Sequence, residues 1–367
     1  MKKARIGVVG AGGIGATAHL PAVVALAESA ELVAIVDLDP VRLAEAGERF
    51  GSPALYSDLA LMLAREKPDI VIIATPPHLH EPLAIQAMEA GAWVFCEKPL
   101  TGSLESVDRI LAAEQATGQW CVTVSQFRYS GGSRQVHQAM RDGVWGAPLL
   151  GIAHTSWYRG PEYWEAAWRG KFATEFGGAT TSQAHHAIDL LLWLMGNDWE
   201  QVSGVAATLA RPIEVEDASV ATVQFRSGAL ASLVSTVLSH HQATTLQIMA
   251  ESATIDLNTL YMPTLEEWSV RALDAAGSPA PLEGWASPEE PKQAHREQLS
   301  ALISSWQRGV QPELTIVEAR STIEFLTALY KSSAVGRPVH RSEIVAGDPF
   351  YSALDAAGPE RAARTHV

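Results

Sequence analysis

The sequence predicts an α/β domain with a doubly wound parallel sheet over residues 1–125, followed by an α+β domain over residues 126–367. Three observations predict this: a glycine-rich turn after the first strand, alternating strand and helix patterns as far as residue 124, and successive short strands between residues 201 and 271. A chain of 367 residues, 47% of them hydrophobic, can form the two cores that such domains need.

The first element is an apolar strand, residues 4–9, which leads directly into Gly10-Ala11-Gly12-Gly13-Ile14-Gly15. This is G-x-G-x-x-G between a strand and a helix, where glycines allow a tight turn, the approach of a pyrophosphate and close helix packing. A second strand, residues 32–36, ends in Asp37, whose carboxylate can accept hydrogen bonds from an adenosine ribose. Because it would repel a 2′-phosphate, NAD is favoured over NADP. Arg42 is expected to be a solvated residue of the next helix; the alternative, that it reaches back toward Asp37, would weaken this preference.

The alternation of strands and helices continues through the first domain. Helices are predicted at residues 40–50, 58–66, 81–90 and 104–117, and strands at 69–74, 93–96 and 120–124. A rigid turn, Thr75-Pro76-Pro77-His78-Leu79-His80, follows one strand. This order is typical of right-handed βαβ units in a parallel sheet.

One lysine has a fixed place in this pattern. The strand 93–96 is followed by Glu97, Lys98 and then Pro99, so Lys98 lies at the carboxyl end of a buried strand. Ligands of open α/β sheets bind beyond these ends, and a functional role for Lys98 is therefore predicted. The alternative is a solvated loop lysine paired with Glu97.

The second domain begins a different pattern. Strands are predicted at residues 202–209, 218–225, 230–238, 244–250 and 253–257, separated by short turns as in an antiparallel sheet. Residues 275–292 are predicted to form a loop, residues 291–307 and 315–332 two helices, and the tail after Phe350 is expected to be loosely held.

Aromatic side chains are concentrated in residues 157–168, where five occur among glycine, proline and charged residues. We expect a loop whose flat rings contact the C–H face of a sugar or cyclitol, although such rings can also be core. A helix predicted from Thr181 places Ser182, His186 and Asp189 on one face. A core-facing stripe is expected at Ala184, Ile188, Leu191 and Met195. Zinc at His185 and His186 is not favoured, since adjacent histidines diverge on a helix and further ligands are missing, so no metal is predicted.

Composition limits the partners. The formal net charge is -14 without a basic patch or tail, which argues against nucleic acid and anionic membranes and favours a small-molecule substrate. Cys96 and Cys121 lie in apolar strands without metal-ligand spacing and are predicted to be buried thiols in a reducing compartment. No signal peptide or transmembrane stretch is recognised, so a cytoplasmic location is expected.

Three motifs in order, the glycine turn at residues 10–15, Glu97-Lys98-Pro99 and the Gly-Gly…His-x-x-Asp segment at residues 177–189, resemble the glucose–fructose oxidoreductase/inositol dehydrogenase/rhizopine catabolism (Gfo/Idh/MocA) family. The resemblance covers nearly the whole chain. It implies a Rossmann domain and a large, open-faced, mostly antiparallel sheet, whose exposed face would form a homodimer or homotetramer interface.

The resemblance also implies roles for individual residues. Lys98 would be the active-site lysine and His186 the general base, with Asp189 at the substrate. Cofactor contacts are implied for Gly10, Gly12, Gly13, Ile14, Gly15, Asp37, Thr75, Pro76, His80, Glu97, Lys98, Gln126, Trp168 and Arg169. Substrate contacts are expected from Lys98, Arg128, Tyr158, Tyr163, Trp168, Ser182, His186 and Asp189. Many members carry aspartate where this chain has Ser182, so a less basic His186 is expected.

The implied activity is NAD-dependent oxidation of a secondary hydroxyl of a sugar, sugar derivative or cyclitol. The same residues would also serve a reductase of a keto- or anhydro-sugar, or an enzyme that keeps its NAD and shuttles hydride between sugars. A non-catalytic NAD-dependent binding or regulatory protein is a further alternative, which Lys98 and His186 disfavour.

Overall fold

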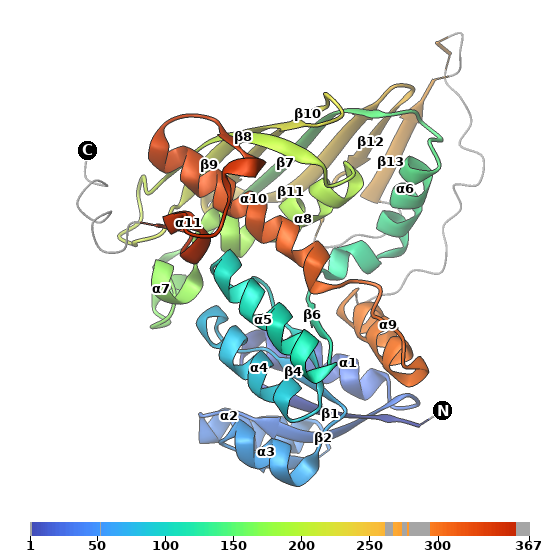
Figure 1. The fold of residues 1–367 in the computed structure, drawn as a ribbon, viewed down its shortest axis with the longest axis vertical. Helices are drawn as coiled ribbons and strands as arrows, with labels where there is room; N and C mark the ends of the chain where they lie inside the picture. The colour runs from blue at the N-terminus through green and yellow to red at the C-terminus, as the bar shows by residue number, and fades with distance from the viewer. Residues whose placement is uncertain (1, 52, 261–266, 274–276, 279–293, 357–367) are drawn as a thin grey trace. The chain divides into compact units, whose positions relative to one another are not determined.

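The computed structural model describes residues 2–51, 53–260, 267–273, 277–278 and 294–356, and the chain forms two compact units (Figure 1). Unit 1 comprises Met1–Gln126 and Gln293–Arg320, and unit 2 comprises Phe127–Lys292 and Ser321–Val367. The sequence places residues 293–320 in the second domain, whereas the structure groups them with the first. Helical periodicity shows that a segment has an apolar side, but not which body that side packs against.

Unit 1 contains a parallel sheet of six strands in the order β3-β2-β1-β4-β5-β6. The strands are β1 (Ala4–Val9), β2 (Ala30–Val36), β3 (Ala54–Tyr56), β4 (Ile70–Ile73), β5 (Trp93–Cys96) and β6 (Cys121–Thr123). The predicted strands are confirmed. The edge strand β3 was not predicted, because three residues are too few to show a periodicity.

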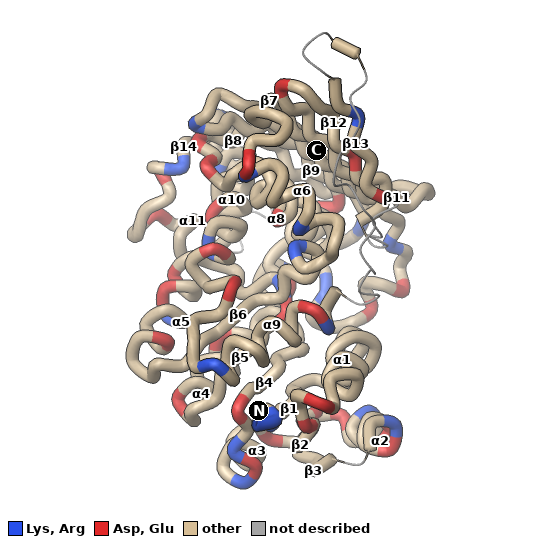
Figure 2. Tube along the Cα trace, turned by 90° about the vertical axis from the view of Figure 1, so that its right-hand side faces the viewer, with Lys and Arg blue, Asp and Glu red and all other residues tan. Residues whose placement is uncertain are grey.

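Helices cover both faces of this sheet (Figures 1 and 2). They are α1 (Leu20–Ala25), α2 (Pro40–Arg49), α3 (Leu59–Glu66), α4 (His80–Glu89), α5 (Leu104–Thr117) and α9 (Ala294–Arg308). α3, α4 and α5 lie on one face, while α1 and α2 lie on the other, where α9 packs against α1. Asp39, Asp58 and Ser103 cap three helix N-termini with their side-chain oxygens, which fixes where those helices begin.

The predicted cofactor residues follow the carboxyl ends of these strands. Gly10 follows β1, Asp37 follows β2, Thr75 lies just beyond β4, Lys98 just beyond β5 and Gln126 just beyond β6. Because the strands are parallel, all five positions lie along one edge of the sheet, where ligands of doubly wound sheets bind.

Unit 2 contains a sheet of eight strands in the order β13-β12-β11-β7-β10-β9-β8-β14. The strands are β7 (Pro148–Tyr158), β8 (Trp199–Ala207), β9 (Ala218–Phe225), β10 (Leu230–Thr236), β11 (Leu238–Ala250), β12 (Ala253–Leu257), β13 (Trp268–Ala272) and β14 (Val339–His340). All neighbours are antiparallel except β7 and β10, which run parallel. The five predicted strands are confirmed. Trp157 and Tyr158, expected in a loop, are instead the last residues of β7.

The two faces of this sheet differ. α8 (His185–Leu194) packs on β7 and β11, and Figure 1 shows α6 (Gly131–Arg141), α8 and α10 (Ile316–Val335) on that side. The other face carries exposed apolar side chains, among which Val205, Val220 and Val234 are register neighbours on β8, β9 and β10. These three valines are 66%, 55% and 38% exposed, so among the described residues that face is open.

Shorter segments complete the described part of unit 2. They include the 3-10 turn Pro161–Trp164, the helix α7 (Phe172–Glu175), the π-helical turn Ala179–Gln183 and the helix α11 (Pro349–Ser352). Tyr351 and Leu354 are buried, so the tail predicted to be loose after Phe350 is packed as far as it is described. The predicted loop at residues 275–292 falls almost wholly outside the described residues.

Charges are mixed over the surface of both units, with Lys and Arg interspersed among Asp and Glu (Figure 2). Cys96 and Cys121 are buried free thiols, as predicted, and burial raises the pKa of both well above the usual value. None of the described helices combines the length and apolar character that crossing a membrane requires.

Candidate active site

The glycine turn has the geometry that each of its glycines was expected to provide. Gly10 has φ of +100°, and a Cβ on it would lie 2.5 Å from the backbone oxygen of Ala74. A Cβ on Gly15 would lie 2.0 Å from the Gly10 oxygen, whereas Gly12 and Gly13 have no heavy atom within 4 Å of an added Cβ. The helical segment beginning here has no side-chain cap at Ile14. Open glycines at an uncapped helix N-terminus can bind a pyrophosphate through backbone N–H groups.

Asp37 is held in place by backbone and by one arginine. Its carboxylate accepts hydrogen bonds from the N–H groups of Ala11 and Asp39, both at 2.8 Å. Arg42 lies on α2 with a side chain that is 52% exposed, as expected of a solvated helix residue. It also reaches back to the end of β2, with Nη2 3.2 Å from Asp37 Oδ1 and a second nitrogen near Asp39.

Two of the buried polar atoms that lack a partner among the described residues belong to residues expected to contact the cofactor. They are Oγ1 of Thr75 and Oε1 of Gln126. Both residues belong to unit 1, and both were expected to contact the cofactor. Buried acceptors and hydroxyls normally have partners, so these two atoms fit a polar group of a bound dinucleotide. Together with the open glycines and Asp37, they make the residues of this unit a good fit for NAD.

His80 was also expected to contact the cofactor, and the structure gives it a different task. Its ring is fully buried, with Nδ1 2.9 Å from the backbone oxygen of Pro99 and Nε2 2.9 Å from the backbone oxygen of Thr75. Burial lowers its pKa. The ring therefore joins the turn at Thr75 to the loop that follows Lys98, and its polar atoms are already engaged.

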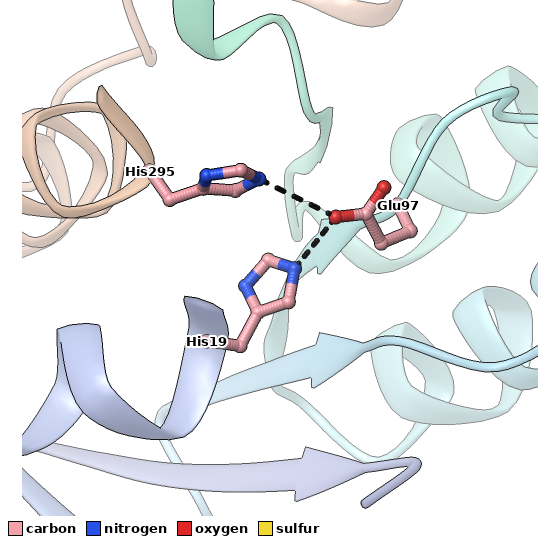
Figure 3. A group of neighbouring side chains, drawn as sticks. All are labelled: His19, Glu97 and His295. Carbon is pink, nitrogen blue, oxygen red and sulfur yellow. Dashed lines mark hydrogen bonds and ion pairs between the residues drawn. The ribbon is translucent and has the colours of Figure 1, made fainter. Parts of the chain in front are cut away.

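Glu97 lies at the centre of a buried cluster that the sequence did not predict (Figure 3). Its Oε1 is 2.8 Å from Nε2 of His19 and 3.7 Å from Nε2 of His295, while Oε2 accepts a hydrogen bond from the Lys98 N–H at 3.0 Å. Burial raises the pKa of Glu97, but the two imidazoles hold it well below its usual range. Burial lowers the pKa of His19. Glu97 thus anchors the Lys98 backbone, and the cofactor contact expected of it stays a prediction.

Two imidazoles and a carboxylate are also a donor set for zinc. A histidine that binds a metal through one nitrogen usually donates the other N–H to a second partner. Nδ1 of His19 is buried and has no such partner among the described residues. The contacts that the structure shows in this cluster are those of Glu97 with the two imidazoles and the Lys98 N–H.

In unit 2 the candidate base His186 lies in the first turn of α8, which follows the π-helical turn Ala179–Gln183. His186 is 6% exposed and packs edge-on against Phe127, with 5.0 Å between the ring centres. Ala184, Ile188, Leu191 and Met195 are buried, as predicted for a core-facing stripe, but burial does not separate them from a polar face, because residues 185–192 are all buried.

Asp189 and Arg128 were both expected to contact substrate, but they form a buried ion pair with each other. Arg128 Nε lies 2.8 Å from Oδ2 of Asp189, Nη2 lies 2.6 Å from Oδ1, and Thr322 donates a further hydrogen bond at 3.0 Å. Burial raises the pKa of Asp189, and the guanidinium outweighs it, so the pKa is lowered. Both side chains are about 5% exposed, and their ion pair helps to fix α8.

The Gly177-Gly178 motif allows the backbone to close over a buried carboxylate. A Cβ on Gly178 would lie 1.9 Å from the backbone oxygen of Glu216, so only glycine fits here. The Glu216 carboxylate accepts hydrogen bonds from the N–H groups of Gly178 and Thr180 and from the Tyr330 hydroxyl. This arrangement fixes the turn that leads into His186.

A polar network connects the aromatic segment to the same turn. Glu175 is fully buried and lies 2.8 Å from Nη1 of Arg169, 2.7 Å from Oγ of Ser182 and 2.6 Å from the Gly170 N–H. The Arg169 guanidinium stacks over Tyr163 and Trp168. Ser182 stands where many members of the resembled family have aspartate. Its hydroxyl donates a hydrogen bond to Glu175, so another residue supplies a carboxylate at this place.

The remaining aromatic residues divide between two environments. Tyr163 hydroxyl contacts Arg169 and accepts a hydrogen bond from Gln183 at 2.6 Å, which keeps it beside the turn before His186. Tyr158 stacks instead on His240 and is 37% exposed. The substrate contact predicted for Tyr158 has no support in this geometry, because its ring belongs to the end of β7 and packs on β11.

The residues that sequence reasoning missed share one property. Each forms a hydrogen bond or ion pair with a residue that is distant in the chain or outside any recognised motif. They are His19, His295, Glu175, Glu216 and Thr322. No local pattern marks them. The only available signal was their chemistry, since buried segments rarely contain unpaired charged residues.

Comparison with known proteins gives two family matches. Residues 4–125 match the model of an oxidoreductase family with an NAD-binding Rossmann fold, and residues 133–256 match the GFO/IDH/MocA C-terminal domain. D-apiose dehydrogenase of Paraburkholderia graminis is 28% identical over 346 residues, covering 91% of this chain and 89% of that protein. Inositol 2-dehydrogenase of Ralstonia nicotianae is 33% identical over 220 residues, which span 59% of this chain and 60% of that protein.

Solved structures agree. The WlbA dehydrogenase of Bordetella pertussis, crystallised with NADH and UDP-GlcNAcA, is 31% identical, with a TM-score of 0.81 over 92% of this chain and 99% of that one. Levoglucosan dehydrogenase, in complex with NADH and levoglucosan, has a TM-score of 0.83 at 22% identity and so supports the fold alone. The chain belongs to the Gfo/Idh/MocA family of NAD-binding sugar and cyclitol oxidoreductases.

Proposed function

We propose that this Gfo/Idh/MocA oxidoreductase oxidises a secondary hydroxyl group of a sugar, sugar derivative or cyclitol by hydride transfer to NAD. The observation that carries the proposal is the shared sheet edge: Lys98 follows the strand next to β4 and lies along the same edge as the open glycines and Asp37. The relatives named above act on a branched sugar and on a cyclitol, which supports the substrate class.

In this proposal His186 removes the proton of the reacting hydroxyl, and Lys98 holds the oxygen. NAD, when bound, supplies the nicotinamide that accepts the hydride. An unperturbed lysine has a pKa of about 10.4, so donating a hydrogen bond is less demanding for Lys98 than acting as a base. Glu97 and its two histidines position the Lys98 backbone, and the Arg128–Asp189 pair positions the helix that carries His186.

Substrate contacts are proposed for the polar and aromatic cluster beside the turn before His186. Tyr163 and Trp168 offer flat rings, and the hydroxyl of Ser182 lies in the same cluster. Rings of this kind pack on the C–H faces of sugars, while hydroxyl and guanidinium groups bind their hydroxyls. Arg128 and Asp189 are left out, because they satisfy each other.

NAD is proposed as the preferred cofactor over NADP. A 2′-phosphate would have to approach the buried Asp37 carboxylate, and the guanidinium of Arg42 is already engaged with Asp37 and Asp39. We also propose a homodimer or homotetramer formed through the open face of the second sheet, where Val205, Val220 and Val234 are exposed. The two free buried thiols fit a cytoplasmic protein.

The test is a panel of cyclitols, aldoses and anhydro-sugars, with NADH formation measured in parallel assays with NAD and NADP. We expect turnover with NAD, and a loss of about 10²–10⁴-fold in Lys98→Met and in His186→Gln with NAD binding retained. Lys67→Met and His241→Gln, both at exposed positions, are matched controls and should keep wild-type rates.

Near-native turnover in both active-site variants would refute the assignment. NADH consumption with a keto- or anhydro-sugar, and no oxidation, would instead identify a reductase. NAD that stays bound through gel filtration would favour hydride exchange between two sugars.

A further inference from the structure

We propose that the substrate carries an anionic group, the carboxylate of a sugar acid or the phosphate of a sugar phosphate, and that Arg159 binds it. This inference rests on the proposed function, since it assigns a chemical class to the substrate of the same site. Arg159 directly follows β7 and belongs to unit 2, as does His186.

Arg128, Arg169 and Arg159 differ in how their charges are neutralised. Arg128 is paired with Asp189, and Arg169 is paired with Glu175, each through a carboxylate that is almost completely buried. Arg159 has no acidic partner within ion-pair distance among the described residues. The nearest acidic residues in the sequence, Glu162 and Glu165, are exposed and form no ion pair with it. The positive charge of Arg159 is therefore not neutralised by an ion pair with any described residue.

The hydrogen bonds of Arg159 are also incomplete. A guanidinium has five N–H donors, and two of them form hydrogen bonds. Nη2 donates to Oε1 of Gln183 at 3.0 Å, and Nη1 donates to the backbone oxygen of Tyr158 at 3.3 Å. Nε is buried and has no partner among the described residues. Donors remain that only a ligand, water or a side-chain movement can satisfy.

The guanidinium is held ready for a ligand. It lies over Trp157 at 4.2 Å and over Tyr163 at 4.9 Å from the ring centres, so both rings limit its motion. Arginine binds carboxylate and phosphate through parallel N–H donors, and an arginine restrained in advance loses less entropy on binding.

The position of this charge suits a substrate of the proposed reaction. Gln183, which accepts from Arg159, is the last residue of the π-helical turn that precedes α8, and its amide nitrogen donates to Tyr163. An anion on Arg159 would thus lie beside the turn that positions His186. The net charge of -14 gives the chain no general attraction for anions, so binding must come from this local excess.

The test compares matched pairs of ligands on the NAD-loaded protein by isothermal titration calorimetry. The acid arm uses D-glucuronate and D-galacturonate against D-glucose and D-galactose, and the phosphate arm uses D-glucose 6-phosphate and myo-inositol 1-phosphate against their neutral parents. We expect at least one anionic ligand to bind tenfold or more tightly than its parent. Arg159→Gln should weaken that ligand by about 10–100-fold and leave the neutral parent unchanged.

Arg226→Gln, on the exposed turn between β9 and β10, is the control and should keep the preference. Arg159→Lys keeps the charge without the fork and should retain part of it, which also covers misfolding of the glutamine variant. Equal binding of all pairs, or equal loss of both members in Arg159→Gln, would overturn the inference. Anion binding without any NADH formation would support the inference and refute the proposed function, and unselective oxidation of neutral sugars would do the reverse.

Discussion

The two candidate catalytic residues are each supported by a buried carboxylate, but the two carboxylates are neutralised by different chemistry. Beside Lys98, Glu97 is held by the imidazoles of His19 and His295. Three residues after His186, Asp189 is held by the guanidinium of Arg128. The first support, at Glu97, includes His19, whose lowered pKa means that it takes up a proton only as the pH falls below 6.5, whereas the guanidinium of the second keeps its charge over the whole working range.

The pH dependence of the two supports follows from the directions of their pKa shifts. His19 has a pKa lowered from 6.5 by burial, so its contribution to stability is complete above that pH and is lost as the pH falls through the folded value. The pKa of Glu97 is lowered from 4.5, and its contribution is lost below that pH. Asp189 starts from 3.8, so the second support loses strength only in stronger acid.

The largest expected effect comes from breaking the ion pair between Arg128 and Asp189. Asp189→Asn or Arg128→Met should lower the free energy of unfolding by about 3–5 kcal/mol, because the partner is left as a buried unpaired charge. Urea unfolding followed by circular dichroism measures this.

The double variant Arg128→Met with Asp189→Leu should be less destabilised than the sum of the single variants, since it leaves no charge behind. Arg337→Met, which breaks an exposed pair with Glu343, should change stability far less. Additive losses in the double variant would show that the pair is not the source of the effect.

An intermediate effect is expected from replacing His19, beside Glu97, with a residue that cannot take up a proton. His19→Gln can still donate to Glu97 from a similar position but cannot take up a proton. The wild-type melting temperature should fall between pH 6.5 and 4.5, and the fall should be smaller in the variant. Thermal melts across this range provide the measurement.

His80 is also buried with a lowered pKa, so the variant should flatten the profile without removing its slope. His241→Gln, at an exposed position of β11, should reproduce the wild-type profile. Identical profiles in wild type and His19→Gln would show that His19 is not the titrating group.

The smallest effect concerns a third carboxylate, Glu175, whose partners are Arg169 and Ser182. Ser182→Ala removes one hydrogen bond and should cost about 0.5–1.5 kcal/mol in urea unfolding. Ser182→Asp should cost more than Ser182→Asn, because only aspartate places a second negative charge beside Glu175. Equal costs would contradict the view that Glu175 already supplies the carboxylate at this position.

Local sequence was enough for the parts of the protein that are formed by neighbouring residues. The glycine turn, Asp37 at the end of β2, Lys98 at the end of β5 and the alternation of strands and helices were all predicted from short patterns. They depend on backbone sterics and on apolar periodicity, which act over a few residues. The parallel arrangement then placed these residues along one sheet edge.

Only the tertiary structure decided what the buried polar groups do. Glu97 meets His19 across 78 residues of sequence, and Arg128 meets Asp189 across 61. The family resemblance assigned Arg128 and Asp189 to the substrate, and the sequence does not show that each one meets the other. A charged side chain becomes an anchor or a ligand according to whether folding brings it an opposite charge, and that depends on the closure of the whole chain. By the same criterion Arg159, to which folding brings no carboxylate within ion-pair distance among the described residues, keeps a charge that a substrate can use.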